Sequence, residues 1–484
     1  RMKNSPIYII IFLLLNLTFK AELYGVKSDI RSSIPSQKSS KIQKPNILFI
    51  MIDDLGKDWV SCYGADDIKT PNIDSLAKGG MKFHNAYSMG SCSPSRTTLL
   101  TGKYPFRTGW VSHWDVPRWG VGYFDWKKKE NTTFARLMKE LGYATAIAGK
   151  WQINDFRVEP NALKKHGFDD WALWTGFETG NPPSDKRYKD PYINTPEDGS
   201  RTYAGKFGPD IYTERLIKFM RAHQDEPMCL YYPMPLLHRP FVPTPDEPSA
   251  KGALGRHKAM VRYVDKMVGQ LVDELNELGI RERTIIFFAS DNGTDVLING
   301  SLNGQKVKGG KGTQNEAGVC GPFIVNCPGT ITAGVETYAL TDLSNMLPTF
   351  VELGGGKLPK DLIVDGKSIA PLILEEEKDS ERDWIMALSY GKAKLDKQGI
   401  LPGQTFGPRV IRDKQYKVWV DQQKKITRLH DLKKDPAEEK NLLESKQRDH
   451  RRAFAKFKKI VKSFPKSDGR PLYEQRAANS WDRK

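Results

Sequence analysis

Two pairs of oxygen-bearing side chains each stand directly after an apolar run. The pairs are Asp53 with Asp54 and Asp291 with Asn292. The first follows Asn46–Ile52 and the second follows Thr284–Ser290, and both runs are typical of strands buried on both faces of a parallel sheet. Ligands gather at the carboxyl ends of such strands, and carboxylate and amide oxygens suit calcium or magnesium. A solvated turn would explain either pair alone, but together they predict a divalent-cation site.

A second chemically distinctive stretch, residues 91–103, reads Ser-Cys-Ser-Pro-Ser-Arg-Thr-Thr-Leu-Leu-Thr-Gly-Lys. Pro94 disfavours helix for the residue before it, whereas Ser95–Leu100 is predicted to be helical. Cys92 is therefore expected just before a helix N-terminus, a position that favours an anion. By itself, a cysteine so placed is more often a buried structural residue.

This stretch resembles the signature of the type I sulfatases of the alkaline phosphatase superfamily, with five further residues in register: Ser95, Arg96, Thr101, Gly102 and Lys103. The resemblance implies that Cys92 is oxidised to formylglycine by a formylglycine-generating or sulfatase-maturating enzyme. In that chemistry one hydroxyl of the aldehyde hydrate attacks sulfur, and the other expels the sulfate by reforming the aldehyde. Arg96 would orient the formylglycine.

Three more segments match the family in order. They are Gly149-Lys150-Trp151, His238-Arg239-Pro240-Phe241 and Lys308-Gly-Gly-Lys311. The resemblance implies that Lys150 and Lys311 bind sulfate and that His238 donates a proton to the departing sugar hydroxyl. A glycine-rich loop with lysine is a weak signal alone. The family's metal is calcium, and the implied ligands are Asp53, Asp54, Asp291, Asn292 and the Cys92-derived group.

The chain departs from the family after Trp151, where relatives carry a histidine and this chain has Gln152. In relatives that histidine is thought to take the proton as sulfate leaves. Glutamine cannot act as a base at neutral pH, and losing a general base costs roughly 10²- to 10⁴-fold in rate. His84 and His113 are the nearest alternatives in the sequence.

Apolar runs alternate with amphipathic helical patterns along most of the chain, which favours an α/β fold. We predict a large central sheet, mixed but mostly parallel and flanked by helices, and a smaller C-terminal α+β subdomain with an antiparallel sheet. Predicted helices include Thr132–Leu141, Ile211–Arg221, His257–Leu278 and the basic His450–Phe464. The irregular segment Gly176–Pro209 is expected to be a substrate-contacting insertion.

The 484 residues allow one large domain and a smaller one. Residues 1–24 are predicted to be a signal peptide, because the apolar run Ile7–Phe19 is too short to span a bilayer. Residues 25–44 are interpreted as a disordered lead-in, 45–374 as the catalytic domain and 375–484 as the C-terminal subdomain. We expect an exported, periplasmic or secreted protein without stable membrane insertion after signal removal.

The net charge of +17 suits an anionic partner, although sulfated polysaccharide, nucleic acid or a lysine-rich proteome would each account for it. With the resemblance, we predict a sulfated saccharide substrate, no nucleic-acid partner, and a monomer or small homo-oligomer. The aromatic segment from Trp110 to Trp126 fits a sugar-binding surface and a satellite core equally well. A Cys320–Cys327 disulfide would be compatible with export.

Three rival functions remain open from the sequence. The first is a phosphodiester or phosphonate monoester hydrolase of the same superfamily. The second is a non-catalytic binder of sulfated glycans, which Gln152 favours. The third is an ordinary thiol enzyme that uses Cys92 unmodified.

Overall fold

The structure is a computed structural model that describes residues 43–111, residues 132–388 except 155, 158, 177, 179 and 180, the backbone of 394–396 and 399–401, and residues 405–469. All of these lie in one compact unit, Lys41–Lys484. The predicted signal peptide and most of the lead-in lie outside the described residues. So do His113 and the aromatic residues between Trp114 and Trp126.

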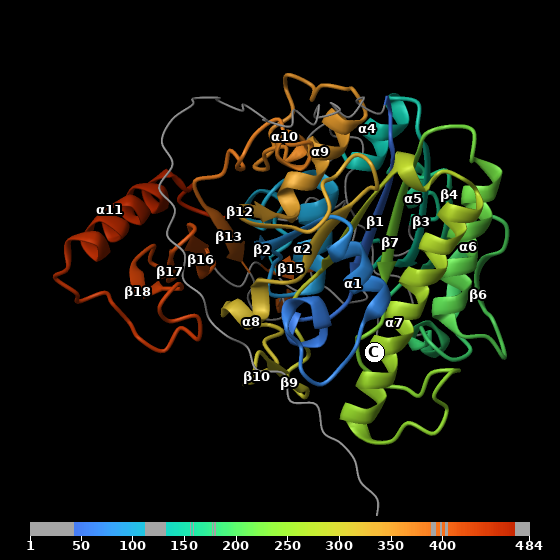
Figure 1. The fold of residues 1–484 in the computed structure, drawn as a ribbon, viewed down its shortest axis with the longest axis horizontal. Coiled ribbons are helices and arrows are strands. Elements are labelled where there is room, and N and C mark those ends of the chain that lie inside the picture. Colours follow the sequence, from blue (N-terminus) through green and yellow to red (C-terminus); the bar gives the residue numbers. More distant parts are fainter. Residues whose placement is uncertain are drawn as a thin grey trace, which may run out of the picture. The chain divides into compact units, whose positions relative to one another are not determined.

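A ten-stranded sheet forms the main layer of the fold (Figure 1). In spatial order its strands are β12 (Val335–Asp342), β2 (Met81–Tyr87), β11 (Phe323–Asn326), β8 (Thr284–Ser290), β1 (Asn46–Ile52), β7 (Met228–Met234), β3 (Ala144–Lys150), β4 (Asp170–Trp174), β5 (Tyr192–Thr195) and β6 (Gly199–Thr202). β11 runs antiparallel to its two neighbours, and so does β5, whereas the remaining pairs are parallel. The predicted mixed, mostly parallel sheet is confirmed.

Helices cover both faces of this sheet, because successive residues of its central strands point into two different cores. Along β1, Phe49 belongs to one core and Ile50 to the other. The first core includes residues of α2 (Cys92–Thr101), α4 (Phe134–Glu140), α5 (Ala162–Lys165), α9 (Met346–Leu353) and α10 (Ala370–Ile373). The second includes residues of α1 (Pro71–Lys78), α6 (Gly208–Ala222) and α7 (Gly252–Glu277).

Most predicted helices are present, with ends that differ by a few residues. α7 begins at Gly252, five residues before the predicted start at His257. The prediction missed its first turn because that turn is exposed and carries no apolar periodicity. The predicted irregular insertion Gly176–Pro209 is wrong in part: β5 and β6 form a hairpin that extends the main sheet beyond β4. The shorter described elements are α3 (Pro105–Thr108), α8 (Glu316–Val319) and the 3-10 turns Lys57–Trp59, Ser61–Tyr63, Pro182–Asp185, Arg281–Arg283 and Leu343–Asn345.

The C-terminal part contains the predicted antiparallel sheet, in the order β13 (Ile385–Leu388), β16 (Arg409–Arg412), β17 (Tyr416–Val420) and β18 (Ile426–Asp431). Helix α11 (Arg448–Ser463) packs on it through Ala453, Phe457 and Val461. The same hydrophobic core also contains Tyr87 and Met89, which lie close to Cys92 in the sequence. Two separate hairpins are formed by β9 (Asn299–Leu302) with β10 (Gln305–Lys308) and by β14 (Lys394–Asp396) with β15 (Gly399–Leu401).

The five cysteines are all thiols in the structure, so the Cys320–Cys327 disulfide is not formed. Lys57 Nζ lies 3.1 Å from Cys320 Sγ, whereas Cys327 Sγ donates to the carbonyl of Glu282 at 3.2 Å. Within the described residues, no helix combines the length and the apolar character that a membrane crossing requires.

Candidate active site

The end of β1 turns sharply and presents two carboxylates. The backbone N–H of Asp53 donates to the carbonyls of Met234 and Leu236 at 3.2 and 3.1 Å, which ties the turn to the end of β7. Asp54 follows with a φ of 63°, in the left-handed region that few residues other than glycine adopt. Both side chains are completely buried. The turn with its left-handed residue therefore aims two carboxylates into the interior at one edge of the sheet.

The pair after β8 meets the pair after β1, because Ile52 and Ser290 are register partners at the ends of the two parallel strands. The Asp54 N–H donates to Asp291 Oδ1 at 3.1 Å, and Asn292 Nδ2 donates to Asp54 Oδ1 at 2.7 Å. The convergence expected of the four side chains is thus present in the structure.

Helix α2 brings Cys92 to the same edge. It begins at Cys92 with Ser91 as N-cap, so the prediction that Cys92 precedes the helix is wrong by one position; Pro94 fits in the first turn, where its missing N–H costs no hydrogen bond. Arg96 anchors the helix by donating to Asp291 Oδ2 at 2.8 Å and lying 3.4 Å from Asp53 Oδ2. Potential ligand atoms of Asp53, Cys92 and Asp291 all lie within 4.8 Å of one another.

Both predicted sulfate-binding lysines point at the carboxylates. Lys150, the last residue of β3, donates to Asp53 Oδ2 at 2.6 Å, and Lys311 donates to Asp54 Oδ2 at 2.7 Å. Gly149 precedes Lys150 with a φ of 134°, and a Cβ there would lie 2.1 Å from the Pro233 carbonyl oxygen. Only glycine therefore allows β3 to approach β7 closely enough to place Lys150.

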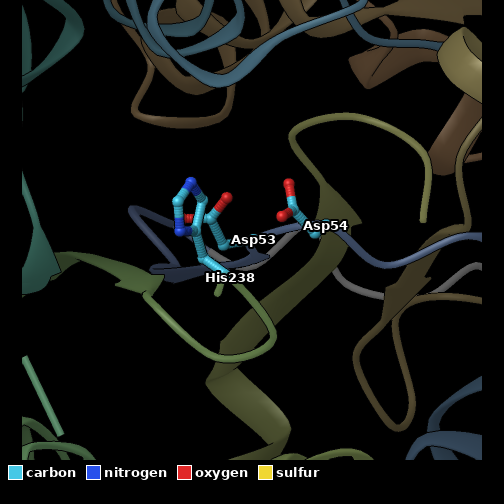
Figure 2. A group of neighbouring side chains, drawn as sticks. All are labelled: Asp53, Asp54 and His238. Carbon is cyan, nitrogen blue, oxygen red and sulfur yellow. The ribbon is translucent and has the colours of Figure 1, made fainter. Parts of the chain in front are cut away.

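His238 lies beside these carboxylates. Figure 2 shows its imidazole next to Asp53, with Asp54 on the adjoining turn, and the three side chains have potential ligand atoms within 4.8 Å of one another. The ring Nδ1 lies 3.0 Å from Arg187 Nη1 and 2.8 Å from the carbonyl oxygen of Arg239. A guanidinium can only donate and a carbonyl can only accept, so these two contacts favour different tautomers.

Burial and charge pull the pKa values of the acids in opposite directions. Burial alone would raise the pKa of Asp53, but Lys150, His238 and Arg96 outweigh it and hold that pKa well below its usual value. Burial raises the pKa of Asp54 to about 6 against the opposing effect of Lys311. Burial and the charge of Asp53 raise the pKa of Asp291 well above its usual value. Such crowded carboxylates favour the entry of positive charge.

Two buried oxygens of this cluster, Asp53 Oδ1 and Asn292 Oδ1, have no hydrogen-bond partner among the described residues. Buried polar atoms are rarely left in this way without a ligand or ion to satisfy them. The surrounding donors are carboxylate and amide oxygens, the ligands that calcium and magnesium prefer. The residues at this edge therefore fit a hard divalent cation.

Gln152 occupies the place next to Cys92, and Cys92 Sγ donates to its Oε1 at 3.4 Å. Gln152 has a φ of 58°, and Gly176 packs closely against its side chain: a Cβ on Gly176 would lie 3.2 Å from Gln152 Cγ. His84 lies elsewhere in the structure: its ring hydrogen-bonds to Glu336 at 2.8 Å and stacks on Tyr338. His113 lies outside the described residues.

The sequence interpretation missed the residues that hold His238. Arg187 stacks over Trp174 with its Cζ 4.0 Å from the ring centroid, and Tyr188 donates to the carbonyl of His238 at 2.6 Å. Both lie in the segment interpreted as an irregular insertion, where no periodicity indicates which side chains point inward. The only available signal was the run of aromatic and basic residues itself.

Comparisons with known proteins relate this chain to sulfatases. The family model described as Sulfatase matches residues 45–356, and the model of the C-terminal region of N-sulphoglucosamine sulphohydrolase matches residues 311–463. The chain is 31% identical over 385 residues to N-acetylgalactosamine-6-sulfatase of Canis lupus familiaris, covering 73% of this chain and 71% of that protein. It is 29% identical over 430 residues to an arylsulfatase of Hemicentrotus pulcherrimus, covering 81% and 76%.

A solved structure described as Ps i-CgsB in complex with k-i-k-neocarrahexaose superimposes with a TM-score of 0.71 at 25% identity, covering 90% of this chain and 95% of that one.

Proposed function

Because this chain belongs to the formylglycine-dependent sulfatase family of the alkaline phosphatase superfamily, we propose that it removes sulfate from sulfated saccharides with formylglycine at position 92 and calcium at the ends of β1 and β8. Membership makes it a sulfuric ester hydrolase. The observation that carries the proposal is the meeting of Cys92, Asp53 and Asp291 within 4.8 Å.

Formylglycine would supply a hydrated aldehyde as the nucleophile for sulfur, and calcium would supply positive charge that draws electrons from the sulfate. Asp53, Asp54, Asp291 and Asn292 would hold the cation. Arg96 holds the start of α2 against Asp291 and so fixes the direction of residue 92. Lys150 and Lys311 would bind sulfate oxygens, and His238 would pass a proton to the departing sugar oxygen.

The balance of charge supports an anionic substrate. When the carboxyls of Asp53, Asp54 and Asp291 are ionised, they contribute three negative charges, which the positive charges of Arg96, Lys150 and Lys311 balance. A divalent cation would make this buried edge net positive, and a sulfate ester would offset part of that charge.

A saccharide substrate is supported by the names of the related proteins, one an N-acetylgalactosamine-6-sulfatase and one solved in complex with k-i-k-neocarrahexaose. The charge of +17 also suits a sulfated polymer. We further propose export through a signal peptide at 1–24, a lead-in over 25–44, a catalytic domain over 45–374, a C-terminal subdomain over 375–484, and a monomer or small homo-oligomer.

The decisive experiment produces the protein together with a sulfatase-maturating enzyme and measures sulfate release from defined sulfated oligosaccharides, with an aryl sulfate and an aryl phosphonate beside them. We expect calcium-dependent release of sulfate and an aldehyde at residue 92 by mass spectrometry. Turnover of the phosphonate above all sulfate esters, or full activity with an unmodified thiol, would contradict the proposal. Gln152 favours one alternative, a non-catalytic glycan binder, and binding without release by aldehyde-containing protein would support that instead.

A further inference from the structure

We propose that the C-terminal sheet positions the active site through a buried ionic clamp, in which Lys417 and Glu438 hold the segment 309–319 that carries Lys311. We call Glu316, Arg412, Lys417 and Glu438 the clamp. The clamp rests on the proposed function only for its catalytic readout, since its mechanical role can be measured without substrate.

Within this segment, the short helix α8 packs against three parts of the chain that carry proposed site residues. A Cβ on Gly310, next to Lys311, would lie 2.3 Å from the Ala317 carbonyl carbon, and a Cβ on Gly293, next to Asn292, would lie 1.8 Å from the Ala317 oxygen. Val319 accepts the N–H of Ser88, four residues before Cys92, at 2.8 Å. Because these contacts are backbone against backbone, a shift of α8 would move all three neighbours.

The Lys311 turn is also tied directly to the segment that leads into α2. The N–H of Lys311 donates to the Thr294 carbonyl at 2.9 Å, and the N–H of Gly312 donates to the Gly90 carbonyl at 2.7 Å. The position of Lys311 relative to Cys92 therefore depends on where the segment 309–319 sits.

The C-terminal part fixes that segment from the other side. Lys417, whose side chain is fully buried, donates to the Gln314 carbonyl at 2.8 Å and lies 3.0 Å from Glu316 Oε1 and 2.8 Å from Glu438 Oε1. Glu438 accepts the N–H of Glu316 at 2.6 Å, at the first residue of α8. Arg412 donates to Glu316 Oε2 at 2.8 Å, and Tyr87 at the end of β2 donates to Oε1.

The clamp contains two positive and two negative side chains, so its charges balance. A buried ion pair of this kind adds little to stability compared with apolar residues of similar size, whereas loss of one member leaves a buried charge without compensation. Glu316, the first residue of this four-residue helix, receives ion pairs from Lys417 and Arg412 and donates its N–H to Glu438, which itself pairs with Lys417. These contacts are therefore better explained by the need to hold that helix in one place.

This assignment gives Glu438 a role. Glu438 is the last residue of the segment Asp435-Pro436-Ala437-Glu438, which has no part in the proposed sulfatase mechanism. Asp435 accepts backbone N–H groups of Glu439 and Lys440 at 3.0 and 2.8 Å, which shapes the turn, and Glu438 reaches across to α8 with a φ of 57°. Lys417 and Glu438 are thus positioning residues for Lys311.

The test compares Lys417→Met, Glu438→Met and the double variant. Each single variant unbalances the charge and should unfold at lower temperature, whereas the double variant restores the balance and should recover most of that loss. We expect kcat with a sulfated oligosaccharide to stay about 10- to 100-fold below wild type in the double variant, because small misplacements of catalytic groups cost rate rather than folding. A matched control is Lys456→Met, which breaks the exposed Lys456–Asp413 pair of 2.8 Å in the same part of the chain and should keep wild-type kcat.

Hydrogen–deuterium exchange provides the second measurement. In the double variant, amides of 309–319 should exchange at least tenfold faster than in wild type, while those of β8 stay protected. A double variant with wild-type kcat and unchanged exchange over 309–319 would overturn the clamp. If the wild-type protein released no sulfate from any ester, the proposed function would fail, and the exchange measurement alone would decide whether the clamp holds the segment.

Discussion

Replacement of Lys150 by methionine tests the cation site by its effect on stability. The ammonium of Lys150 lies 2.6 Å from Asp53 Oδ2, and both side chains are fully buried. Loss of one member of a buried pair costs about 3–5 kcal/mol, since the other charge is left without its partner. Arg96 remains 3.4 Å from the same oxygen, so we expect the lower end, about 3 kcal/mol, when calcium is removed with a chelator.

Calcium should cancel most of that loss. Like charges about 4 Å apart repel by about 4 kcal/mol at an effective dielectric constant near 20, so a cation beside Asp53 binds more favourably once the lysine is gone. Ligand that binds only the folded state stabilises it in proportion to the logarithm of its concentration over Kd. We therefore expect the difference between Lys150→Met and wild type to fall below about 1 kcal/mol in saturating calcium.

The assay is urea unfolding at pH 7, with chelator or with calcium, for wild type, Lys150→Met and a matched control. Lys266→Met is that control, because it breaks an exposed pair with Asp246 of 2.8 Å and should change stability by at most about 1 kcal/mol in either condition. An equal deficit for Lys150→Met with and without calcium would refute the assignment of Asp53 as a cation ligand.

Three further outcomes are expected. Gln152→His should raise kcat by up to about 10²-fold above pH 6.5, because a base would then stand where Gln152 contacts Cys92 at 3.4 Å; a flat kcat–pH profile would argue that Gln152 is not the missing base position. Cys92→Ala should abolish sulfate release while leaving circular dichroism and calcium binding intact, and turnover like that of wild type would defeat the mechanism. Burial raises the pKa of Glu316, but Lys417 and Arg412 outweigh it and lower that pKa to about 2. The ionised Glu316 carboxylate should therefore stabilise the fold by about 3 kcal/mol above pH 4.3, and this contribution should disappear as the pH falls toward 2. In urea unfolding, wild type and Glu316→Gln should differ at pH 5 and converge near pH 2. A difference that stays constant with pH would exclude this linkage.

The fold was predictable where one element carries its own pattern. β1 and β8 are continuous apolar runs because both faces are buried, and the oxygen-bearing pairs that follow them had to meet once the strands were parallel neighbours. The hairpin of β5 and β6 was not predicted, since its exposed residues, such as Gly199 and Arg201, show no regular apolar alternation. Its strand character comes from pairing with β4 at the sheet edge, which no local pattern reports.

The same distinction applies to the site. Asp53 was recognisable because it directly follows a buried strand, whereas Cys92 and Lys150 were assigned through the resemblance to the sulfatase signature. Arg187 was not recognisable, because its position over Trp174 and against His238 depends on side chains brought together only by the fold. Long-range charge pairing has no periodicity, and a basic residue in a loop is far more often solvated than buried.

Lys417 shows how this limit affects the description of domains. In the linear sequence it belongs to the predicted C-terminal subdomain, more than a hundred residues after Glu316. Its contacts, however, join it to the segment that carries Lys311, and the family model of the C-terminal region likewise begins at residue 311. Since Lys311 contacts Asp54 on one side of this segment and Lys417 holds the other, the placement of the lysine proposed to bind sulfate depends on both parts of the chain. A catalytic domain expressed without residues 375–484 would therefore retain every proposed catalytic side chain but lose the contacts that set the position of one of them.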